Sequence, residues 1–224
     1  MTPWVPEKKD VLAALADDIL HNYGKGRTLV AVDGIDVAGT ARFADDLADA
    51  MRLKGHAVFR ASIEGFHRPR AERYARGRDS PEGFYRDSYD YLTFQRTLVQ
   101  PFRMGGSTGF VAEAFDVRRD AQVEPVWLTG PADALLIVDG GFLNRPELRG
   151  LWNYSVWLEV ADDEADDRRA LRDSAAPNPR PGRQLRYSGA QALYALEAKP
   201  RTAATAIVDN TDADHPRRRF ADSC

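Results

Sequence analysis

The sequence is poor in the residues that disulfides, cysteine-based metal sites and membrane spans require. Its 224 residues include one cysteine, Cys224 at the end of the chain, so an intrachain disulfide framework and a cysteine-ligated zinc site are excluded. No apolar run approaches the 18 residues of a membrane-spanning helix, and the first residues do not resemble a signal peptide. We therefore expect a cytoplasmic protein that does not bind a membrane.

An excess of positive charge is also lacking. Lysine and arginine total 31 against 34 aspartates and glutamates, which gives a net charge of −3. Because binding to a nucleic-acid backbone requires a basic surface, nucleic acid is not an expected partner. The arginine run Arg217–Arg219 follows a proline and is predicted to be a solvated end. With 43% hydrophobic residues, the chain is long enough to bury the core of one domain, residues 1–224, and is compatible with a homo-oligomer.

Continuous apolar segments alternate with helical patterns along the chain. Strands are predicted at 28–33, 57–63, 134–138, 155–160 and 204–208, helices at 8–23, 41–52 and 91–102, and a ribbon of two strands at 110–117 and 123–128. Such an alternation is typical of an α/β fold with a parallel sheet covered on both faces. Ligands of these sheets bind beyond the carboxyl ends of the strands, here Asp33, Glu64, Asp139 and the turn after Val160.

The segment after the first predicted strand is built like a phosphate-binding loop. Gly34 and Gly39 occupy the two glycine positions of the pattern G-x-x-x-x-G-K-[ST]. Thr40 stands where the pattern has the lysine that reaches the phosphates, and Ala41 stands where it has the hydroxyl that binds Mg²⁺. The segment is either a phosphate loop without its phosphate-binding side chains or an ordinary connection between a strand and a helix.

Longer motifs carry a resemblance to a known family. They are GIDVAGTA at 34–41, RASIEGFHRPR at 60–70, GRDSPEGFY at 77–85, VDGGFLNRPEL at 138–148, RRALRD at 168–173 and VDNTD at 208–212. In this order they closely resemble bacterial uridine kinase-like proteins over nearly the whole chain. The resemblance implies a three-layer P-loop nucleoside kinase-like fold, with a mostly parallel five-stranded sheet and an arginine-bearing lid at approximately residues 162–186.

The departures from this family fall on the side that binds ATP. In the family, ATP donates its γ-phosphoryl group to a nucleoside or a similar hydroxyl compound, with lysine, arginine and Mg²⁺ neutralising the charge. Its loop is similar to G-x-D-G-S-G-K-[ST], so Val37 replaces a glycine, at about 1–3 kcal/mol if the loop keeps a positive φ there. Glu64 replaces the catalytic aspartate of the family. Ala41 cannot bind Mg²⁺, so the donor site is expected to be lost.

The acceptor side is predicted to be kept. By resemblance, Asp79 holds sugar hydroxyls, Phe84 and Tyr85 wall a base or ring, the lid carries Arg169 and Arg172, and Gln191 and Tyr194 follow the lid. Asp36 matches the family pattern, or alternatively caps the N–H groups of the loop. The sequence thus predicts a pocket for a nucleoside-like small molecule beside a degenerate phosphate loop comprising Gly34, Asp36, Gly39, Thr40 and Ala41.

Three functions remain open from the residues. The first is a repurposed acid/base enzyme of lyase, isomerase or hydrolase type, with Glu64, His67 and Asp139 as catalytic groups. In that role Glu64 serves as a base if burial raises its pKa. The second is a pseudokinase that binds a ligand without turnover. The third is an ATP-dependent kinase in which Arg42 or Arg169 replaces the lysine. No metal or cofactor is expected under the first two hypotheses, and MgATP is expected only under the third.

Overall fold

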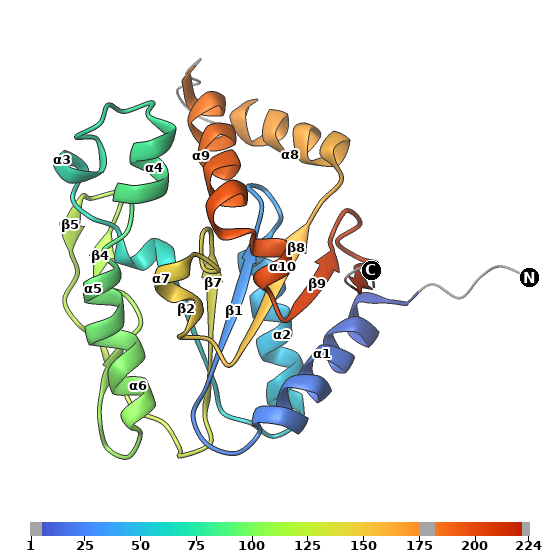
Figure 1. Ribbon diagram of the computed structural model, residues 1–224. Helices are drawn as coiled ribbons and strands as arrows, with labels where there is room; N and C mark the ends of the chain where they lie inside the picture. Colours follow the sequence, from blue (N-terminus) through green and yellow to red (C-terminus); the bar gives the residue numbers. More distant parts are fainter. Residues whose placement is uncertain (1–5, 175–181, 221–224) are drawn as a thin grey trace, which may run out of the picture.

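A six-stranded sheet forms the centre of the protein. The computed structural model describes residues 6–174 and 182–220, and its sheet has the strand order β10-β9-β8-β1-β7-β2 (Figure 1). The strands are β1 (Thr28–Gly34), β2 (Val58–Ser62), β7 (Leu135–Gly140), β8 (Tyr154–Glu159), β9 (Ala206–Asp209) and β10 (Arg217–Arg219). The first five are parallel to one another, and β10 pairs antiparallel with β9. The predicted α/β fold is confirmed, with six strands instead of five.

The additional strand is the arginine run that was predicted to be a solvated end. Its three arginines pair with β9, and Arg217 lies opposite Asp209. Arg219 contacts Asp209 at 2.6 Å, and Arg218 contacts Asp18 of the first helix at 2.8 Å. Charged side chains are common on edge strands because they discourage pairing with other chains. The three positive charges of residues 217–219 are therefore compatible with a place at the edge of the sheet.

Alternate residues of β1 point into the two cores of the molecule. Val30 and Val32 pack with helices α1 (Lys8–Tyr23) and α2 (Thr40–Leu53). Leu29 and Ala31 face the other side, where α5 (Tyr91–Phe94), the π-helical turn η2 (Gln95–Val99), α6 (Gln100–Met104) and α9 (Gly182–Ala198) supply the core. Because both faces of the strand are buried, its sequence is continuously apolar, as in other parallel sheets.

The polar, aromatic segment after β2 forms short helices instead of an irregular loop. They are η1 (Ile63–Phe66), α3 (Arg70–Arg73) and α4 (Pro81–Asp87). Ser80 caps α4 by accepting a hydrogen bond from the N–H of Gly83 at 3.0 Å. The helix predicted at 91–102 is present as α5, η2 and α6 in succession.

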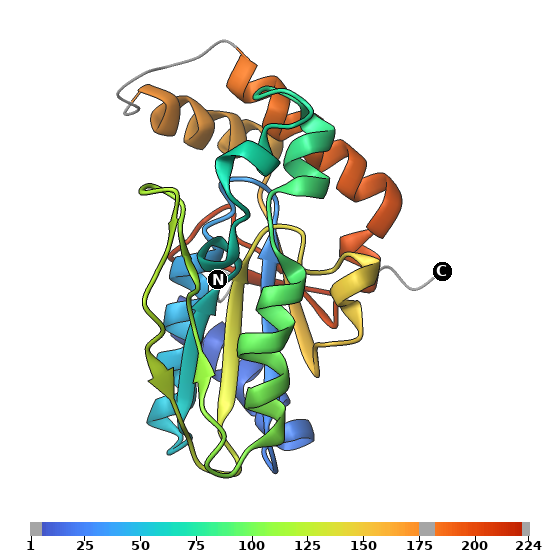
Figure 2. The ribbon, with the colours of Figure 1, turned by 90° about the vertical axis from the view of Figure 1, so that its left-hand side faces the viewer.

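The predicted ribbon is present with shorter strands. β3 (Phe110–Val111) pairs with β6 (Trp127–Leu128), and β4 (Phe115–Asp116) pairs with β5 (Ala121–Gln122). Figure 2 shows the ribbon beside β2. The rings of Phe59 on β2 and Phe110 on β3 meet edge-to-face with centroids 5.1 Å apart, so the ribbon covers part of this side of the sheet.

Two helices lie above the carboxyl ends of β1 and β8 (Figure 1). They are α8 (Asp162–Ser174) and α9, and the predicted lid corresponds to α8 and the start of α9. Residues 175–181, between the two helices, lie outside the described residues. The remaining helices are α7 (Pro146–Arg149) and α10 (Pro200–Ala203). Within the described ranges, no helix is both long enough and apolar enough to span a membrane.

Candidate functional site

A pocket of about 440 Å³ lies at the carboxyl ends of β1, β2 and β7, beneath α8 and α9. The loop between β1 and α2 forms its floor. Its other walls are Ser62 and Glu64 after β2, residues 139–142 at the end of β7, Phe84 and Tyr89, and Arg172, Arg183, Tyr187 and Gln191 from the two upper helices. The pocket thus lies where parallel sheets usually bind their ligands.

The loop has a left-handed backbone at two positions. Gly39 has a φ of 80°, and Val37 has a φ of 67° although it is β-branched. The surroundings hold the loop: the Asn210 side chain donates to the carbonyl of Ala38 at 2.8 Å, and Arg168 donates to the carbonyl of Val37 at 3.3 Å. The loop therefore keeps a positive φ where the related sequences have glycine, and the strain expected at Val37 is present.

The left-handed backbone at position 37 predicts that glycine is more stable there than alanine, the reverse of their usual order. At ordinary positions alanine is more stable than glycine by about 0.5–1 kcal/mol, because glycine loses more chain entropy. A left-handed backbone instead costs an L-residue about 1–2 kcal/mol that glycine avoids. Because both substitutions remove the valine side chain, we expect Val37→Gly to be about 1 kcal/mol more stable than Val37→Ala. Urea unfolding of the two variants measures this difference, and a more stable alanine variant would contradict the assigned conformation.

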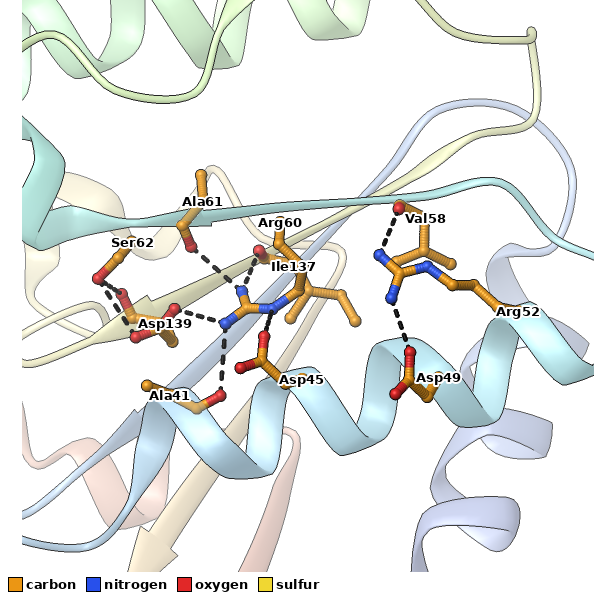
Figure 3. Close-up of polar contacts among 10 residues, drawn as sticks. All are labelled: Ala41, Asp45, Asp49, Arg52, Val58, Arg60, Ala61, Ser62, Ile137 and Asp139. Atoms are coloured by element: carbon orange, nitrogen blue, oxygen red, sulfur yellow. Dashed lines mark hydrogen bonds and ion pairs between the residues drawn. The ribbon is translucent and has the colours of Figure 1, made fainter. Parts of the chain in front are cut away.

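Arg60 is the most fully bonded cation near the pocket, and Figure 3 shows its guanidinium between β2, β7 and α2. Its Nη2 donates to Oδ1 of Asp139 at 2.7 Å and lies 3.5 Å from the carbonyl oxygen of Ala41. Its Nε donates to Asp45 at 2.9 Å. Its Nη1 donates to the carbonyls of Ile137 at 2.7 Å and Ala61 at 3.2 Å. The sequence analysis missed this residue, although a charged side chain inside a strand is a signal.

Asp139 is therefore part of an ion pair and not a free acid/base group. Its side chain is 6% exposed, and its second oxygen accepts from the hydroxyl of Ser62 at 3.2 Å. Burial raises the pKa of Asp139 above its ordinary value, although the hydrogen bond and charge of Arg60 act in the opposite direction. We predict a catalytic role for this carboxylate, and in the structure its two oxygens are hydrogen-bonded to Arg60 and Ser62.

Glu64 stands at the mouth of the pocket and is held from two sides. Its Oε1 accepts from the hydroxyl of Tyr89, and its Oε2 lies 2.9 Å from Nε2 of His67. Nδ1 of His67 lies 2.9 Å from the carbonyl of Ser88, which can only accept, so Nδ1 carries a proton. The contact between His67 and Glu64 then requires one further proton, on one of the two groups.

The pKa of Glu64 shifts in the direction opposite to the one that a general base needs. Burial raises the pKa, but the hydrogen bond and charge of His67 and the hydroxyl of Tyr89 lower it below its ordinary value. The condition that we set for a catalytic base, a raised pKa, is therefore not met. With 56% of its side chain exposed, Glu64 is an ionised acceptor facing the pocket. It is suited to accepting hydrogen bonds from ligand hydroxyls.

Arginines of α8 bind the loop directly. Nη1 of Arg172 donates to both carboxylate oxygens of Asp36, at 2.7 and 2.8 Å. Nε of Arg169 lies 3.8 Å from the same carboxylate, and its Nη1 contacts Asp166 at 2.7 Å. The guanidinium of Arg172 also lies over the ring of Tyr187, 5.0 Å from its centroid. The predicted lid arginines are thus beside the loop, and Asp36 is their partner.

Several predicted pocket residues lie elsewhere. Tyr85 is 1% exposed and packs against Phe142 with ring centroids 5.1 Å apart, because it lies on the buried side of α4. Asp79 is exposed, does not line the pocket, and lies against Gly182 at the start of α9. Of the predicted acceptor residues, Phe84, Arg172 and Gln191 line the pocket. Arg169 does not line it, and His67 lines a neighbouring cavity of about 330 Å³.

Asp33, predicted at the ligand-binding edge, is fully buried below the pocket. Its Oδ2 accepts from the hydroxyl of Tyr194 and from the backbone and side-chain N–H groups of Asn144, both at 2.9 Å. Its Oδ1 accepts from Gly34 at 2.8 Å. Burial raises the pKa of Asp33 to about 6, although these hydrogen bonds act to lower it. Asp33 joins β1, the turn after β7, and α9.

Several solved structures similar to this chain are described as kinases. A protein described as a possible uridine kinase from Bacillus stearothermophilus matches with a TM-score of 0.70 and 20% identity, over 89% of this chain and 97% of that chain. A candidate fructose transport system kinase from Silicibacter sp. TM1040 gives 0.62 and 24%, over 86% and 94%. D-glycerate 3-kinase from Cryptococcus neoformans gives 0.57 and 12%, over 85% and 87%. The protein therefore has the P-loop kinase fold.

These likenesses establish the fold and not the activity. No protein-family model and no curated protein sequence matches the chain.

The Mg²⁺ that this fold commonly uses does not fit the residues present. P-loop proteins hold it with the hydroxyl after the loop lysine and with a carboxylate at a strand end. Here Ala41 has no hydroxyl, and both oxygens of Asp139 are bonded, one to Arg60 and one to Ser62. Across residues 6–174 and 182–220, no group of three or more histidine, cysteine or acidic side chains is arranged to hold a metal.

Proposed function

We propose that this protein is a cytoplasmic binding protein for a small hydroxylated molecule of nucleoside, nucleotide or sugar type, and that it does not transfer phosphate from ATP. The observation that carries the proposal is a kinase-fold pocket whose loop keeps its backbone but has Thr40 and Ala41 at the lysine and metal positions. Loss of one charge-assisted contact costs about 1.5–3 kcal/mol in binding. With the hydroxyl at position 41 also missing, two of the groups that would hold MgATP are absent.

The remaining walls suit a ring that carries hydroxyl groups. The volume of about 440 Å³ lies within the range of small-molecule sites. Phe84 and Tyr187 offer aromatic surfaces whose ring centroids lie 4.8 Å apart in an edge-to-face pair. Glu64 supplies carboxylate acceptors and Gln191 an amide. These groups support a ligand with one flat face and several hydrogen-bond donors.

Proton transfer, if the bound molecule is converted, falls to Glu64 and His67. Asp139 is already paired with Arg60, so we do not assign it a role as acid or base. The contact between Nε2 of His67 and Glu64 gives one shared proton position beside the pocket. The lowered pKa of Glu64 argues against Glu64 as the base of a repurposed acid/base enzyme, so binding without conversion, as in a pseudokinase, is the form that the site supports better.

The alternative function is an ATP-dependent nucleoside kinase that uses a substitute cation. It is favoured by Arg183, which lines the pocket above the loop. Arg172 also lines the pocket, but it already donates to both carboxylate oxygens of Asp36. The two arginines that the sequence suggested are less suitable. Arg42 is exposed and does not line the pocket, and Arg169 contacts Asp166 and Asp36.

Titration calorimetry with MgATP separates the two functions. We expect no saturable heat with the native protein up to about 1 mM MgATP, because losing the lysine contact alone weakens binding by at least tenfold. The variant Thr40→Lys/Ala41→Thr restores both side chains on a loop that already has its backbone shape. We expect it to bind MgATP through the lysine contact with the phosphates, while Asp139 stays paired with Arg60. Thr40→Gln/Ala41→Val is the matched control, because it changes the same positions without restoring either function.

Micromolar binding of MgATP by the native chain would refute the main proposal and establish the kinase alternative. Uridine and ribose are titrated in parallel in the absence of ATP. Binding of neither would remove the support for a nucleoside- or sugar-type ligand.

A further inference from the structure

The guanidinium of Arg60 occupies the space between the carboxylate of Asp139 and the start of α2. Its Nη2 reaches both Oδ1 of Asp139, at 2.7 Å, and the carbonyl oxygen of Ala41, at 3.5 Å (Figure 3). This is the place between a strand-end carboxylate and the residue after the loop lysine. The fold commonly holds a divalent cation at this carboxylate, and Arg60 contacts the carboxylate without lining the pocket itself.

The position of Arg60 is fixed by more than its partner Asp139. A guanidinium has five N–H donors, and here they meet five acceptors on α2, β2 and β7. Only 17% of the side chain is exposed. Releasing Asp139 would therefore require Arg60 to give up Asp45 and the carbonyl of Ile137 as well.

The residue at position 41 completes the arrangement. A serine or threonine there would bring a hydroxyl to the start of α2, as the motif requires for Mg²⁺. Alanine brings a methyl group, which neither binds a cation nor competes with a guanidinium for the carboxylate. Ala41 and Arg60 are therefore two parts of one local change: the metal ligand is lost, and an internal positive charge neutralises the remaining carboxylate.

We propose that Arg60 is a built-in replacement for the divalent cation of this fold, so that the pocket binds its ligand, including any phosphate group on it, without a metal ion. The statement about the ligand rests on the proposed function. The statement about Arg60 does not, because it concerns whether Asp139 is available to a cation.

Mn²⁺ binding, followed by electron paramagnetic resonance of the free ion, tests the proposal without any organic ligand. We expect the native protein and the single variant Ala41→Thr to leave 1 mM Mn²⁺ free. We expect Arg60→Ala/Ala41→Thr to bind one Mn²⁺ at least tenfold more tightly than either. Arg60→Gln/Ala41→Thr serves as a second uncharged variant that keeps hydrogen-bonding capacity at position 60, and circular dichroism identifies which of the two is folded.

A matched control keeps the cation. Arg60→Lys/Ala41→Thr has the hydroxyl together with a positive charge, and we expect it to leave Mn²⁺ free. Equal Mn²⁺ binding by Ala41→Thr alone would show that Arg60 does not exclude a metal, and the proposal would be wrong. Failure of every folded, uncharged variant to bind Mn²⁺ would overturn it as well. Either result is independent of whether uridine, ribose or MgATP binds.

Discussion

Replacing Arg60 with methionine is expected to lower the free energy of unfolding by about 3–5 kcal/mol, the range measured when one partner of a buried ion pair is removed. The two partners are nearly enclosed, with 17% of the Arg60 side chain and 6% of the Asp139 side chain exposed. Methionine keeps most of the side-chain volume. The lost free energy of unfolding therefore comes mainly from the unpaired carboxylate of Asp139 and from the backbone carbonyls that lose their donor. Urea unfolding at pH 7 measures it.

Arg52 provides a matched control on the same helix surface (Figure 3). It also bonds a carboxylate of α2 and a carbonyl of β2, Asp49 at 2.8 Å and Val58 at 2.9 Å. Its side chain is 45% exposed and that of Asp49 is 71% exposed, so we expect Arg52→Met to cost less than about 1 kcal/mol. Adding Asp139→Asn to Arg60→Met is expected to recover part of the loss. Equal losses for Arg52→Met and Arg60→Met would show that burial of the Arg60 pair has no energetic role.

The ionisation of Asp33 is expected to cost about 3 kcal/mol of stability above pH 6. Burial raises its pKa from the ordinary 3.8 to about 6 in the folded state, and each pKa unit corresponds to 1.36 kcal/mol. Between these values the folded state holds a proton that the unfolded state has released. The contribution of Asp33 is therefore complete below about pH 4 and is lost as the pH rises through about 6.

Comparison with Asp33→Asn isolates this group from the other acids. The variant has no proton to lose at position 33, so its other pH dependence cancels in the difference. We expect the native chain to lose about 2–2.5 kcal/mol relative to the variant between pH 4 and pH 7, measured by urea unfolding. The carboxyl carbon of Asp33, followed by NMR, is expected to titrate near pH 6. A midpoint below 4, with a constant stability difference, would contradict the assigned environment.

The sheet was predictable because its signal is local. Continuous apolar segments mark β1, β7 and β8, and the burial of both faces of these strands explains that pattern. β10 was not predictable, because three arginines carry no apolar pattern. Their charges are paired with Asp209 and Asp18, which belong to other elements and are brought close only by the fold. The short helices after β2 were missed for a similar reason, since their polar sequence has no clear period.

The site was predictable only where a motif fixes the backbone. The loop and Glu64 lie at strand ends, and the fold places strand ends together. Phe84 and Tyr85 are neighbours in sequence, but α4 turns one toward the pocket and the other into the core, and the sequence alone does not show which. Arg60 was missed because its importance comes from Asp139, 79 positions away, and not from its own neighbours.

The left-handed conformation of Val37 shows that the loop is shaped by its surroundings more than by its own residues. Asn210 and Arg168 hold the carbonyls of residues 37 and 38, and β1 and α2 fix the ends. A backbone held in this way keeps its shape with side chains other than those of the phosphate-loop pattern. An evolutionary or engineered return to phosphate binding would then need exchanged side chains at a few positions and no new backbone. The shape of this loop is therefore set apart from the side chains at positions 40 and 41, which do not belong to the phosphate-loop pattern.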